Sequence, residues 1–502
     1  MEYVKHRLIK PGKIESRLYQ ESILSSAVNK NTLVVLPTGL GKTPIAAVLA
    51  VERLNKYPES KILILAPTKP LTNQHYKSFK EFLDIPEEEM VVITGETKPV
   101  ERVALYQNKK ILFATPQTIK NDLEEERLNL KNFSLLVIDE IHHAVGAYAY
   151  PFVAKKYLEE AENQRILGLT ASPGFSSEKI EEVKKNTGIE AVEIRTEQSQ
   201  DVQPYVMEKK TEWIKVDLPE RFLTIRKMLL EEYNKRITTL KKMGFLRAVR
   251  VSKKELLSLQ VELIKAAKGG YKNSIIGLSV IGQAIRLEHA LILLETQGIS
   301  ILDKYFEKLR NEEKNKTLAA NKNVSNAIFL TRKLKEEGYK HPKIGKICSV
   351  VNQQIVEKPD SKIIIFANYR DTVREIVSTL KGIEGVKPVE FVGQKEGVTQ
   401  KKQVQTLNEF RLDVHNVLVC TSIGEEGLDI PSMDLAVFYE PAPSEIRTIQ
   451  RRGRVGRQKA GKVIILITRG TRDEAYYWSA HHKERQMKGI LEDMRRKNLW
   501  EY

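Results

Sequence analysis

The sequence predicts an α/β protein with two domains, each a doubly wound parallel sheet, and an all-helical domain between them. Three observations support this prediction. Short β-branched runs alternate with helical patterns from about residue 15 to 205, and the same rhythm returns from about residue 341. Residues 221–340 contain none of the 19 prolines of the chain. Continuous apolar runs are typical of strands buried on both faces of a parallel sheet, and helices between them make the sheet doubly wound.

The first domain is predicted to cover residues 1–205. Its apolar runs have the length and composition of buried strands, and longer segments with helical spacing separate them. The predicted strands are 32–36, 62–66, 90–94, 111–115, 135–138 and 166–170.

The second sheet domain is predicted at residues 341–471, followed by a helical tail at 472–502. The predicted strands are 362–367, 387–392, 416–421, 435–439 and 463–468. The tail mixes aromatic and basic residues, which could stack on bases. Packing of its aromatic side chains onto the second domain is the favoured interpretation.

The middle segment, residues 206–340, is predicted to be a linker followed by a basic helical insert. Apolar residues recur at helical spacing over 275–294. Residues 221–340 hold 25 Lys and Arg against 12 Asp and Glu, a net charge of +13. Solvated, lysine-rich helices would explain the lysines. So uneven a balance favours a surface that faces nucleic acid.

The composition limits the class of protein. The 82 Lys and Arg exceed the 65 Asp and Glu, and the net charge of +17 favours a polyanionic partner. Two cysteines, Cys348 and Cys420, are too few for a disulfide scaffold, and no Cys/His group has zinc-ligand spacing. No signal peptide is recognised and no stretch approaches about 18 uncharged apolar residues, so no membrane span is predicted. A cytoplasmic protein is expected.

A glycine-rich segment follows the run at 32–36 and precedes a helical pattern, which is the context of a phosphate-binding loop. Thr38, Gly39 and Gly41 lie in this loop, where backbone N–H groups can turn toward phosphate oxygens at a helix N-terminus. Lys42 is expected to reach the β- and γ-phosphates of ATP, and Thr43 to bind Mg²⁺. A leucine stands where the usual pattern has its first glycine. The alternative, a surface turn with a chance Gly-Lys pair, is disfavoured by the strand–loop–helix order.

Two acids, Asp139 and Glu140, end the apolar run at 135–138. Acids at the end of a buried strand are costly unless they meet a cation. Asp139 is therefore expected to bind Mg²⁺, and Glu140 to orient and deprotonate the attacking water. An ordinary acidic strand end is the alternative.

An arginine-dense block with glycines covers residues 450–457. A flexible surface loop is one interpretation. In the other, Arg454 and Arg457 act as arginine fingers on the transferring phosphoryl group, with Gln450 beside them. Arginines from a second domain would make hydrolysis depend on domain closure.

Together these motifs resemble those of the superfamily 2 helicases, in the family's order. The phosphate loop matches motif I, the Asp-Glu-Ile-His sequence matches the DExH motif II, and the arginine block matches motif VI. The resemblance implies two RecA-like domains, with Arg17 and Gln20 at the adenine. It also implies that His142, Thr170 and Ser172 couple hydrolysis to movement.

The remaining family motifs imply contacts with ATP or with backbone phosphates. Gly427 and Asp429 are expected at the nucleotide. Threonines after strands suit phosphate oxygens, although capping a helix is the commoner role of such a threonine. The residues implied in nucleic-acid binding are Pro67, Thr68, Lys69, Thr94, Gly95, Thr115, Asn368, Arg370 and Thr421.

Further segments resemble the archaeal Hef and Fanconi anaemia M helicases. They lie at 43–48, 146–150, 204–206, 295–298 and 470–478. Members of this family have a thumb-like helical insert between the RecA-like domains, act on forked and branched DNA, and move 3′→5′. Many archaeal members add an XPF-type nuclease with a Glu-Arg-Lys signature. That triplet is absent from this sequence, so nuclease activity is not predicted, and a separate nuclease could act as a partner.

We therefore expect an ATP- and Mg²⁺-dependent DNA helicase that remodels forked or branched DNA as a monomer. Two alternatives stay open. The innate-immune RNA-sensing helicases share the DExH core and also have a helical insert, so a duplex-RNA sensor is one alternative. A P-loop ATPase that moves something else is the other.

Overall fold

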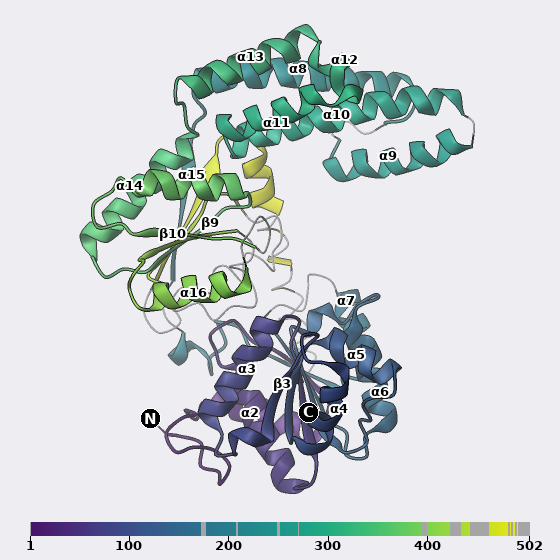
Figure 1. The fold of residues 1–502 in the computed structure, drawn as a ribbon, viewed down its shortest axis with the longest axis vertical. Coiled ribbons are helices and arrows are strands. Elements are labelled where there is room, and N and C mark those ends of the chain that lie inside the picture. Colours follow the sequence, from purple (N-terminus) through teal and green to yellow (C-terminus); the bar gives the residue numbers. More distant parts are fainter. Residues whose placement is uncertain are drawn as a thin grey trace.

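The computed structural model describes residues 2–171, 177–206, 209–247, 251–269, 271–393, 399–421, 433–441 and 461–479, with isolated positions beyond 479. The second sheet domain lies between the first domain and the helical insert (Figure 1). The insert separates the two sheet domains in the chain, but in space it extends from the far end of the second one.

The first domain contains a seven-stranded sheet in the order β3-β4-β2-β5-β6-β1-β7, and all its pairings are parallel. Its strands are β1 (Thr32–Val35), β2 (Lys61–Leu65), β3 (Met90–Ile93), β4 (Ile111–Ala114), β5 (Phe133–Asp139), β6 (Ile166–Thr170) and β7 (Ala191–Ile194). Its helices are α1 (Leu18–Asn29), α2 (Lys42–Lys56), α3 (Lys69–Phe82), α4 (Pro99–Asn108), α5 (Pro116–Glu124), α6 (Ala149–Glu160) and α7 (Ser177–Thr187).

Both faces of this sheet are buried, as the continuous apolar runs predicted. Along β1, Leu33 and Val35 pack into the core on one face, and Val34 packs into the core on the other. Every predicted strand of the first domain is present. The structure adds β7 at one edge, where the first three of its four residues are only half-buried and one of them is a glutamate.

Over the described residues, the second sheet has six strands in the order β10-β11-β9-β12-β13-β8. Its strands are β8 (Lys209–Val216), β9 (Ile363–Phe366), β10 (Pro388–Phe391), β11 (Val417–Cys420), β12 (Leu435–Phe438) and β13 (Gly461–Thr468). The helices α14 (Pro342–Glu357) and α15 (Arg370–Leu380) cover one face, and α16 (Gln400–Arg411) covers the other (Figure 1).

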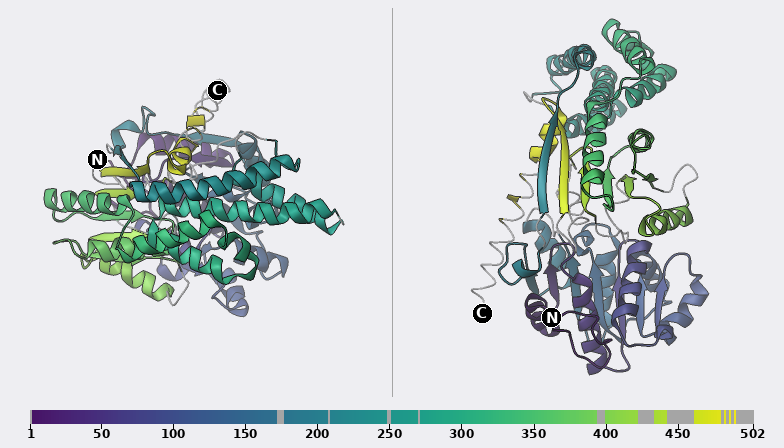
Figure 2. Two further views of the ribbon diagram at one scale, coloured as in Figure 1. Left: turned by 90° about the horizontal axis from the view of Figure 1, so that it is seen from above. Right: turned by 90° about the vertical axis from the view of Figure 1, so that its left-hand side faces the viewer.

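Strand β8 corrects the expectation that residues 206–340 hold only a linker and helices. It pairs with β13 along eight residues, and Figure 2 shows the two long strands side by side. The sequence pattern did not predict this strand because it lies at the sheet edge and is rich in lysine, unlike the central strands. The ring of Trp213 on β8 packs against the ring of Tyr477 in a tilted arrangement, with 4.3 Å between the ring centres, so this tail aromatic packs on the second domain as the favoured interpretation predicted.

The insert is helical, as predicted. It contains α8 (Glu220–Lys242), α9 (Lys253–Lys268), α10 (Lys272–Thr296), α11 (Ile299–Asn311), α12 (Lys316–Ala319) and α13 (Lys322–Glu336). Phe222 and Leu229 of α8 share one core with Leu287 and Leu291 of α10. Full burial of such a side chain stabilises the fold by about 1.5–3 kcal/mol.

One described helix is long and apolar enough to cross a membrane by length and composition. This is α10, with a mean hydropathy of 1.4 over Asn273–Thr296. The expectation concerned uncharged stretches, and it is not contradicted, because Arg286, Glu288 and Glu295 interrupt this helix. Helix α10 is apolar because it is the central helix of the insert and packs against α8, α9 and α11, so apolar residues occupy more than one of its faces.

Candidate active site

The predicted phosphate loop connects β1 to α2 at the carboxyl edge of the first sheet. Gly41 stands directly before α2 with φ 83°, in the left-handed region. Residues other than glycine rarely adopt this φ, and a Cβ here would lie 2.3 Å from Nε2 of Gln20, so the Gln20 amide would have to move. Lys42 begins the helix, and its Nζ lies 3.4 Å from the carbonyl oxygen of Leu36. The loop therefore presents a helix N-terminus and a lysine at one point.

The residues predicted to read adenine lie behind this loop. Gln20 is buried, and its Nε2 donates to the carbonyl oxygens of Leu40 (3.3 Å) and Gly41 (3.4 Å). The guanidinium of Arg17 lies 5.0 Å from the ring centre of Tyr205. In this structure Gln20 therefore stabilises the phosphate loop itself, and adenine binding stays a prediction.

The two predicted catalytic acids end β5 beside the loop. Asp139 is buried, and its Oδ2 accepts a hydrogen bond of 2.9 Å from Nε2 of His75. Tyr150 donates its hydroxyl to the backbone oxygen of Asp139 at 2.7 Å. Neither His75 nor Tyr150 was predicted as a site residue. For His75, the only sequence signal was a histidine within an otherwise amphipathic helix that follows a strand.

Glu140 turns the chain out of β5. Its φ of 50° is unusual for a residue other than glycine, and it leads into the 3₁₀ helix Ile141–His143. Such strain concentrates at functional sites.

The carboxylate of Glu140 belongs to a short polar chain. Nδ1 of His142 lies 3.2 Å from Oε2 of Glu140 and 3.0 Å from Oγ1 of Thr170. Burial raises the pKa of the Glu140 carboxyl. The contact with His142 and the positive charge of Lys42 lower this pKa by more, so its net value is about 2. Glu140 is therefore ionised at neutral pH, as a general base must be. The structure brings together the predicted residues Lys42, Glu140, His142 and Thr170.

The side chains around the loop fit ATP and Mg²⁺. Oγ1 of Thr38 is buried and has no hydrogen-bond partner among the described residues, so it is available to a ligand in this loop. Thr43 lies in the first turn of α2, and Asp139 offers the carboxylate that Mg²⁺ prefers. When bound, ATP supplies the phosphoryl group and Mg²⁺ neutralises its charge.

The predicted nucleic-acid residues of the first domain follow β2, β3 and β4 at the same sheet edge. Thr68 caps α3, with Oγ1 accepting from the N–H of Leu71 at 3.5 Å. Thr115 precedes α5, and its Oγ1 lies 2.8 Å from Oγ1 of Thr118. Lys69 pairs with Glu96. The hydroxyls thus have local partners, and phosphate contacts stay a prediction. The other residues of this set, Pro67, Thr94 and Gly95, lie in the same loops.

The predicted residues of the second domain are only partly described. The N–H of Asn368 donates to Oε1 of Glu440 at 2.7 Å, and Nη2 of Arg370 donates to the oxygen of Gly393 at 2.7 Å. Thr421 follows β11 and is buried. The predicted residues Ser172, Gly427, Asp429, Gln450, Arg454 and Arg457 lie outside the described residues.

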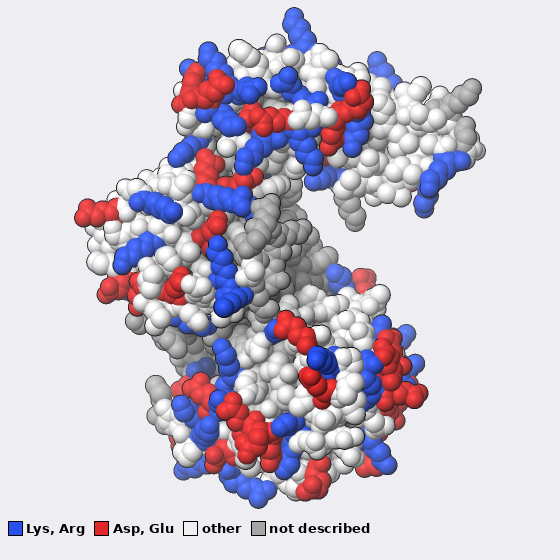
Figure 3. Space-filling model, in the orientation of Figure 1, with Lys and Arg blue, Asp and Glu red and all other residues white. Residues whose placement is uncertain are grey.

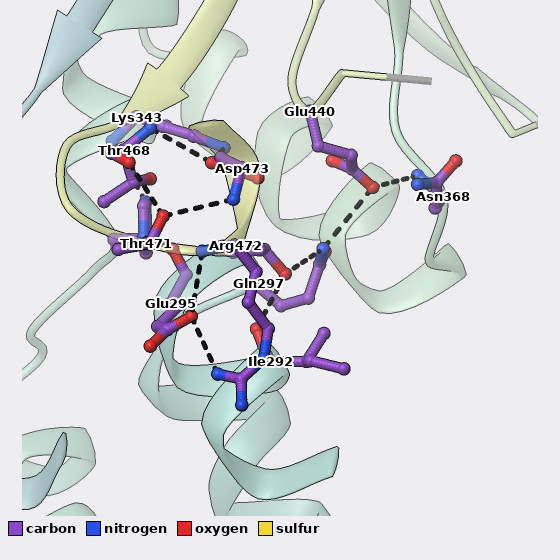
Figure 4. Close-up of polar contacts among 12 residues, drawn as sticks. Ile292, Glu295, Gln297, Lys343, Asn368, Glu440, Thr468, Thr471, Arg472 and Asp473 are labelled. Carbon is purple, nitrogen blue, oxygen red and sulfur yellow. Dashed lines mark hydrogen bonds and ion pairs between the residues drawn. The ribbon is translucent and has the colours of Figure 1, made fainter. Parts of the chain in front are cut away.

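A buried polar cluster joins the insert to the second domain (Figure 4). At the end of α10, the side chain of Glu295 is 1% exposed. It accepts from Nε of Arg226 at 2.7 Å, and from Nη1 and the backbone N–H of Arg472 at 3.1 and 3.2 Å. Arg472 belongs to the segment after β13. Two segments that support the resemblance to Hef, 295–298 and 470–478, therefore meet in space.

The same cluster reaches the predicted DNA-binding residue Asn368 (Figure 4). Gln297 donates from Nε2 to Glu440 at 3.4 Å and accepts from the hydroxyl of Thr372 at 2.6 Å. Oε1 of Glu440 is also the acceptor for the N–H of Asn368. The insert is thus hydrogen-bonded to α15 and to Glu440 after β12, and Glu440 in turn bonds to the loop that follows β9.

Comparison with known proteins agrees with this arrangement. The model of the restriction-enzyme family "Type III restriction enzyme, res subunit" matches residues 13–175, and "Helicase conserved C-terminal domain" matches residues 342–459. A helical-bundle model of ATP-dependent RNA helicases matches residues 221–338. The solved helicase domain of Pyrococcus furiosus Hef is 46% identical, with a TM-score of 0.75 over 94% of this chain and 99% of that one. The chain belongs to the Hef and Fanconi anaemia M type of superfamily 2 helicases.

Curated relatives of this helicase family are longer. A protein of Methanocaldococcus jannaschii, provisionally named an ATP-dependent RNA helicase, is 44% identical over 98% of this chain and 63% of its own length. An ATP-dependent DNA helicase, mph1, of Neurospora crassa is 34% identical over 92% of this chain and 41% of its own length. The chain therefore spans less than two thirds of these relatives. Its two parallel sheets and helical bundle are those of the Hef helicase domain.

Proposed function

We propose that this protein is an ATP-dependent DNA helicase or translocase that remodels forked or branched DNA. The observation that supports this best is the meeting of Lys42, Glu140, His142 and Thr170 at one sheet edge, beside the loops with the predicted phosphate-binding threonines. ATP hydrolysis and a nucleic-acid strand would then share that edge.

In the proposed reaction, Lys42 binds the phosphates, and Thr43 and Asp139 hold Mg²⁺. Glu140, ionised at neutral pH, takes the proton of the attacking water. Arg454 and Arg457, assigned as arginine fingers, would neutralise charge on the transferring group. Nδ1 of His142 and Oγ1 of Thr170 lie 3.0 Å apart. In the proposal, these two residues couple hydrolysis at the general base Glu140 to movement of the nucleic-acid strand.

The far end of the insert offers a surface for duplex DNA. Figure 3 shows basic side chains at the tip of the arm formed by α9 and the start of α10, and mixed charges over the rest of the insert. The exposed side chains of Lys242, Lys265 and Lys268, toward this end, make no ion pair with any described residue. Such lysines suit a phosphate backbone, which is bound without sequence preference.

Duplex RNA is the second candidate ligand. One relative is named for RNA, and the family model that matches the insert is also named for RNA helicases. The DNA proposal is favoured by relatives such as mph1, which are named for DNA.

The test is ATP turnover of the full chain alone, with forked DNA, with linear duplex DNA and with duplex RNA. We expect forked DNA to stimulate turnover most, and the stimulation to fall steeply with salt because phosphate contacts dominate. Equal rates with and without nucleic acid would contradict the proposal, and preferential stimulation by duplex RNA would favour the second candidate.

We further propose an intracellular, cytoplasmic site of action, a monomeric motor, and a nuclease that acts as a separate partner. A strand-displacement assay on forks, flaps and four-way junctions identifies the preferred structure. The sedimentation coefficient of the complex with forked DNA tests whether the motor is a monomer. Two copies of the chain on one fork would contradict this proposal.

A further inference from the structure

Helix α3 connects two parts of the proposed machinery. Its first residue is Lys69 and its cap is Thr68, both predicted to contact nucleic acid. Two turns later the same helix places His75 against Asp139, the predicted Mg²⁺ ligand, with 2.9 Å between Nε2 and Oδ2. His75 lies six residues after Lys69, about 9 Å along the helix axis.

The contact between His75 and Asp139 is enclosed by protein. The side chains are 6% and 9% exposed. Nδ1 of His75 is buried and has no hydrogen-bond partner among the described residues, so its Nε2 makes the histidine's only polar contact there. Because a carboxylate only accepts, Nε2 carries the proton and donates it. No described side chain donates to the other carboxylate oxygen, Oδ1.

Helix α3 is held tightly where His75 lies. The ring of Phe79 packs edge-on to Phe113 of β4 at 5.2 Å, and the ring of Tyr76 packs on the same residue at 5.8 Å. The side chain of Thr72 bonds back to the oxygen of Thr68 at 3.0 Å. The middle of α3 therefore has a fixed place on β4, and the same continuous helix runs from His75 back to Lys69 in its first turn.

We propose that His75 is a positioning residue that orients the carboxylate of Asp139 for Mg²⁺ and links that carboxylate to the nucleic-acid-facing end of α3. The inference rests on the proposed function. Hydrogen bonds to metal-binding carboxylates orient the ligand, and their loss costs about 10–100-fold in metal affinity or activity. His75 therefore makes Mg²⁺ binding depend on the position of α3.

Thermodynamic linkage gives this arrangement a measurable consequence. If DNA shifts α3 toward a position that improves the orientation of Asp139, DNA tightens Mg²⁺–nucleotide binding. Mg²⁺–nucleotide must then tighten DNA binding by the same factor. The hydrogen bond between His75 and Asp139 is the part of this linkage that a substitution can remove.

Four variants distinguish the loss of the hydrogen-bond donor of His75 from the loss of its packing. His75→Leu keeps an apolar side chain in the buried position and removes the donor. His75→Gln places an amide N–H at a comparable reach. His75→Asn is polar but too short, and it replaces the leucine variant should that one fail to fold. Tyr76→Phe is the matched control, because it removes only the bond to Glu87 at 2.8 Å on the exposed side of the same helix.

The experiment measures binding of a fluorescent ATP analogue to the full chain as Mg²⁺ is titrated, with and without forked DNA. A Glu140→Gln background prevents turnover, so affinity is read without catalysis. We expect His75→Leu to raise the half-saturating Mg²⁺ concentration by about 10-fold or more and to abolish the effect of DNA. His75→Gln and Tyr76→Phe should behave as the parent.

A parent-like Mg²⁺ titration and a parent-like DNA effect in His75→Leu or His75→Asn would overturn the inference. If the parent responds to DNA in the ATPase assay, the proposed function stands in that case and only the role of His75 fails. A parent whose nucleotide binding needs no Mg²⁺ and ignores DNA would overturn both.

Discussion

Replacing Lys343 by methionine should destabilise the second domain by about 3–5 kcal/mol. Lys343 lies in the first turn of α14, and its Nζ is 2.5 Å from Oδ2 of Asp473, with both side chains 0% exposed. Apart from Lys343, Asp473 accepts only the backbone N–H of Thr468, at 3.1 Å, among the described residues. Its Oδ1 has no hydrogen-bond partner there. Removing the ammonium therefore leaves a buried carboxylate almost unpaired.

The chain offers a matched control in Lys304. It also pairs with an aspartate from another element, Asp371, at 2.8 Å, but the side chains are 54% and 36% exposed. Solvent screens such a pair, so Lys304→Met should cost less than about 1 kcal/mol. The double variant Lys343→Met/Asp473→Leu should recover most of the loss, because it removes both buried charges.

Tryptophan fluorescence is a suitable assay because the first domain contains none of the three tryptophans of the chain. Trp213 lies on β8, and Trp478 follows Tyr477 in the segment packed beside it. A loss of about 3–5 kcal/mol corresponds to a melting shift of roughly 6–20 °C for a domain of this size. A shift for Lys343→Met no larger than that for Lys304→Met would refute the reasoning.

Three further predictions concern the candidate active site. Glu140→Gln should keep ATP binding within a few-fold and abolish turnover, measured by nucleotide titration and phosphate release; rapid turnover would contradict a role as base. His142→Ala removes the hydrogen bond that lowers the pKa of Glu140 most, while Lys42 and burial remain, so this pKa should rise from about 2 and the carboxylate should protonate at higher pH. Its ATPase rate should therefore fall more between pH 8 and pH 5 than that of the parent, and an unaltered ratio would count against the contact. Gly41→Ala should prevent ATP binding because its Cβ meets Gln20, whereas Gly12→Ala, at a similar φ of 72° with open space, should not; equal nucleotide affinities in the two would argue against a steric cause.

The sequence predicted the central parts of both sheets correctly, because strands buried on two faces must be continuously apolar. It did not predict β7 and β8, which lie at the sheet edges. An edge strand such as β8 tolerates lysines, so its composition resembles that of a linker. The predicted boundary at residue 205 therefore falls before a strand of the second sheet.

The candidate site shows a similar division. The positions of Lys42, Asp139 and Glu140 were predictable because each belongs to a short motif with a fixed place after a strand, and their roles stay predictions. His75 was not, since its partner is 64 positions away in the chain and a single histidine in a helix has no distinguishing pattern. Only the packing of α3 against the sheet brings the two together. The roles of the predicted nucleic-acid residues stay predictions.

The contacts of the insert decide how it moves. Its first helix, α8, follows directly from β8, which is paired with β13 along its whole length. Its central helix ends at Glu295 and Gln297, whose buried side chains bond to groups of the second domain. A pivot of the insert on that domain would leave these groups unpaired in a dry environment, at a cost of several kcal/mol. The insert is therefore an extension of the second sheet domain, and any motion of that domain against the first moves the basic arm with it.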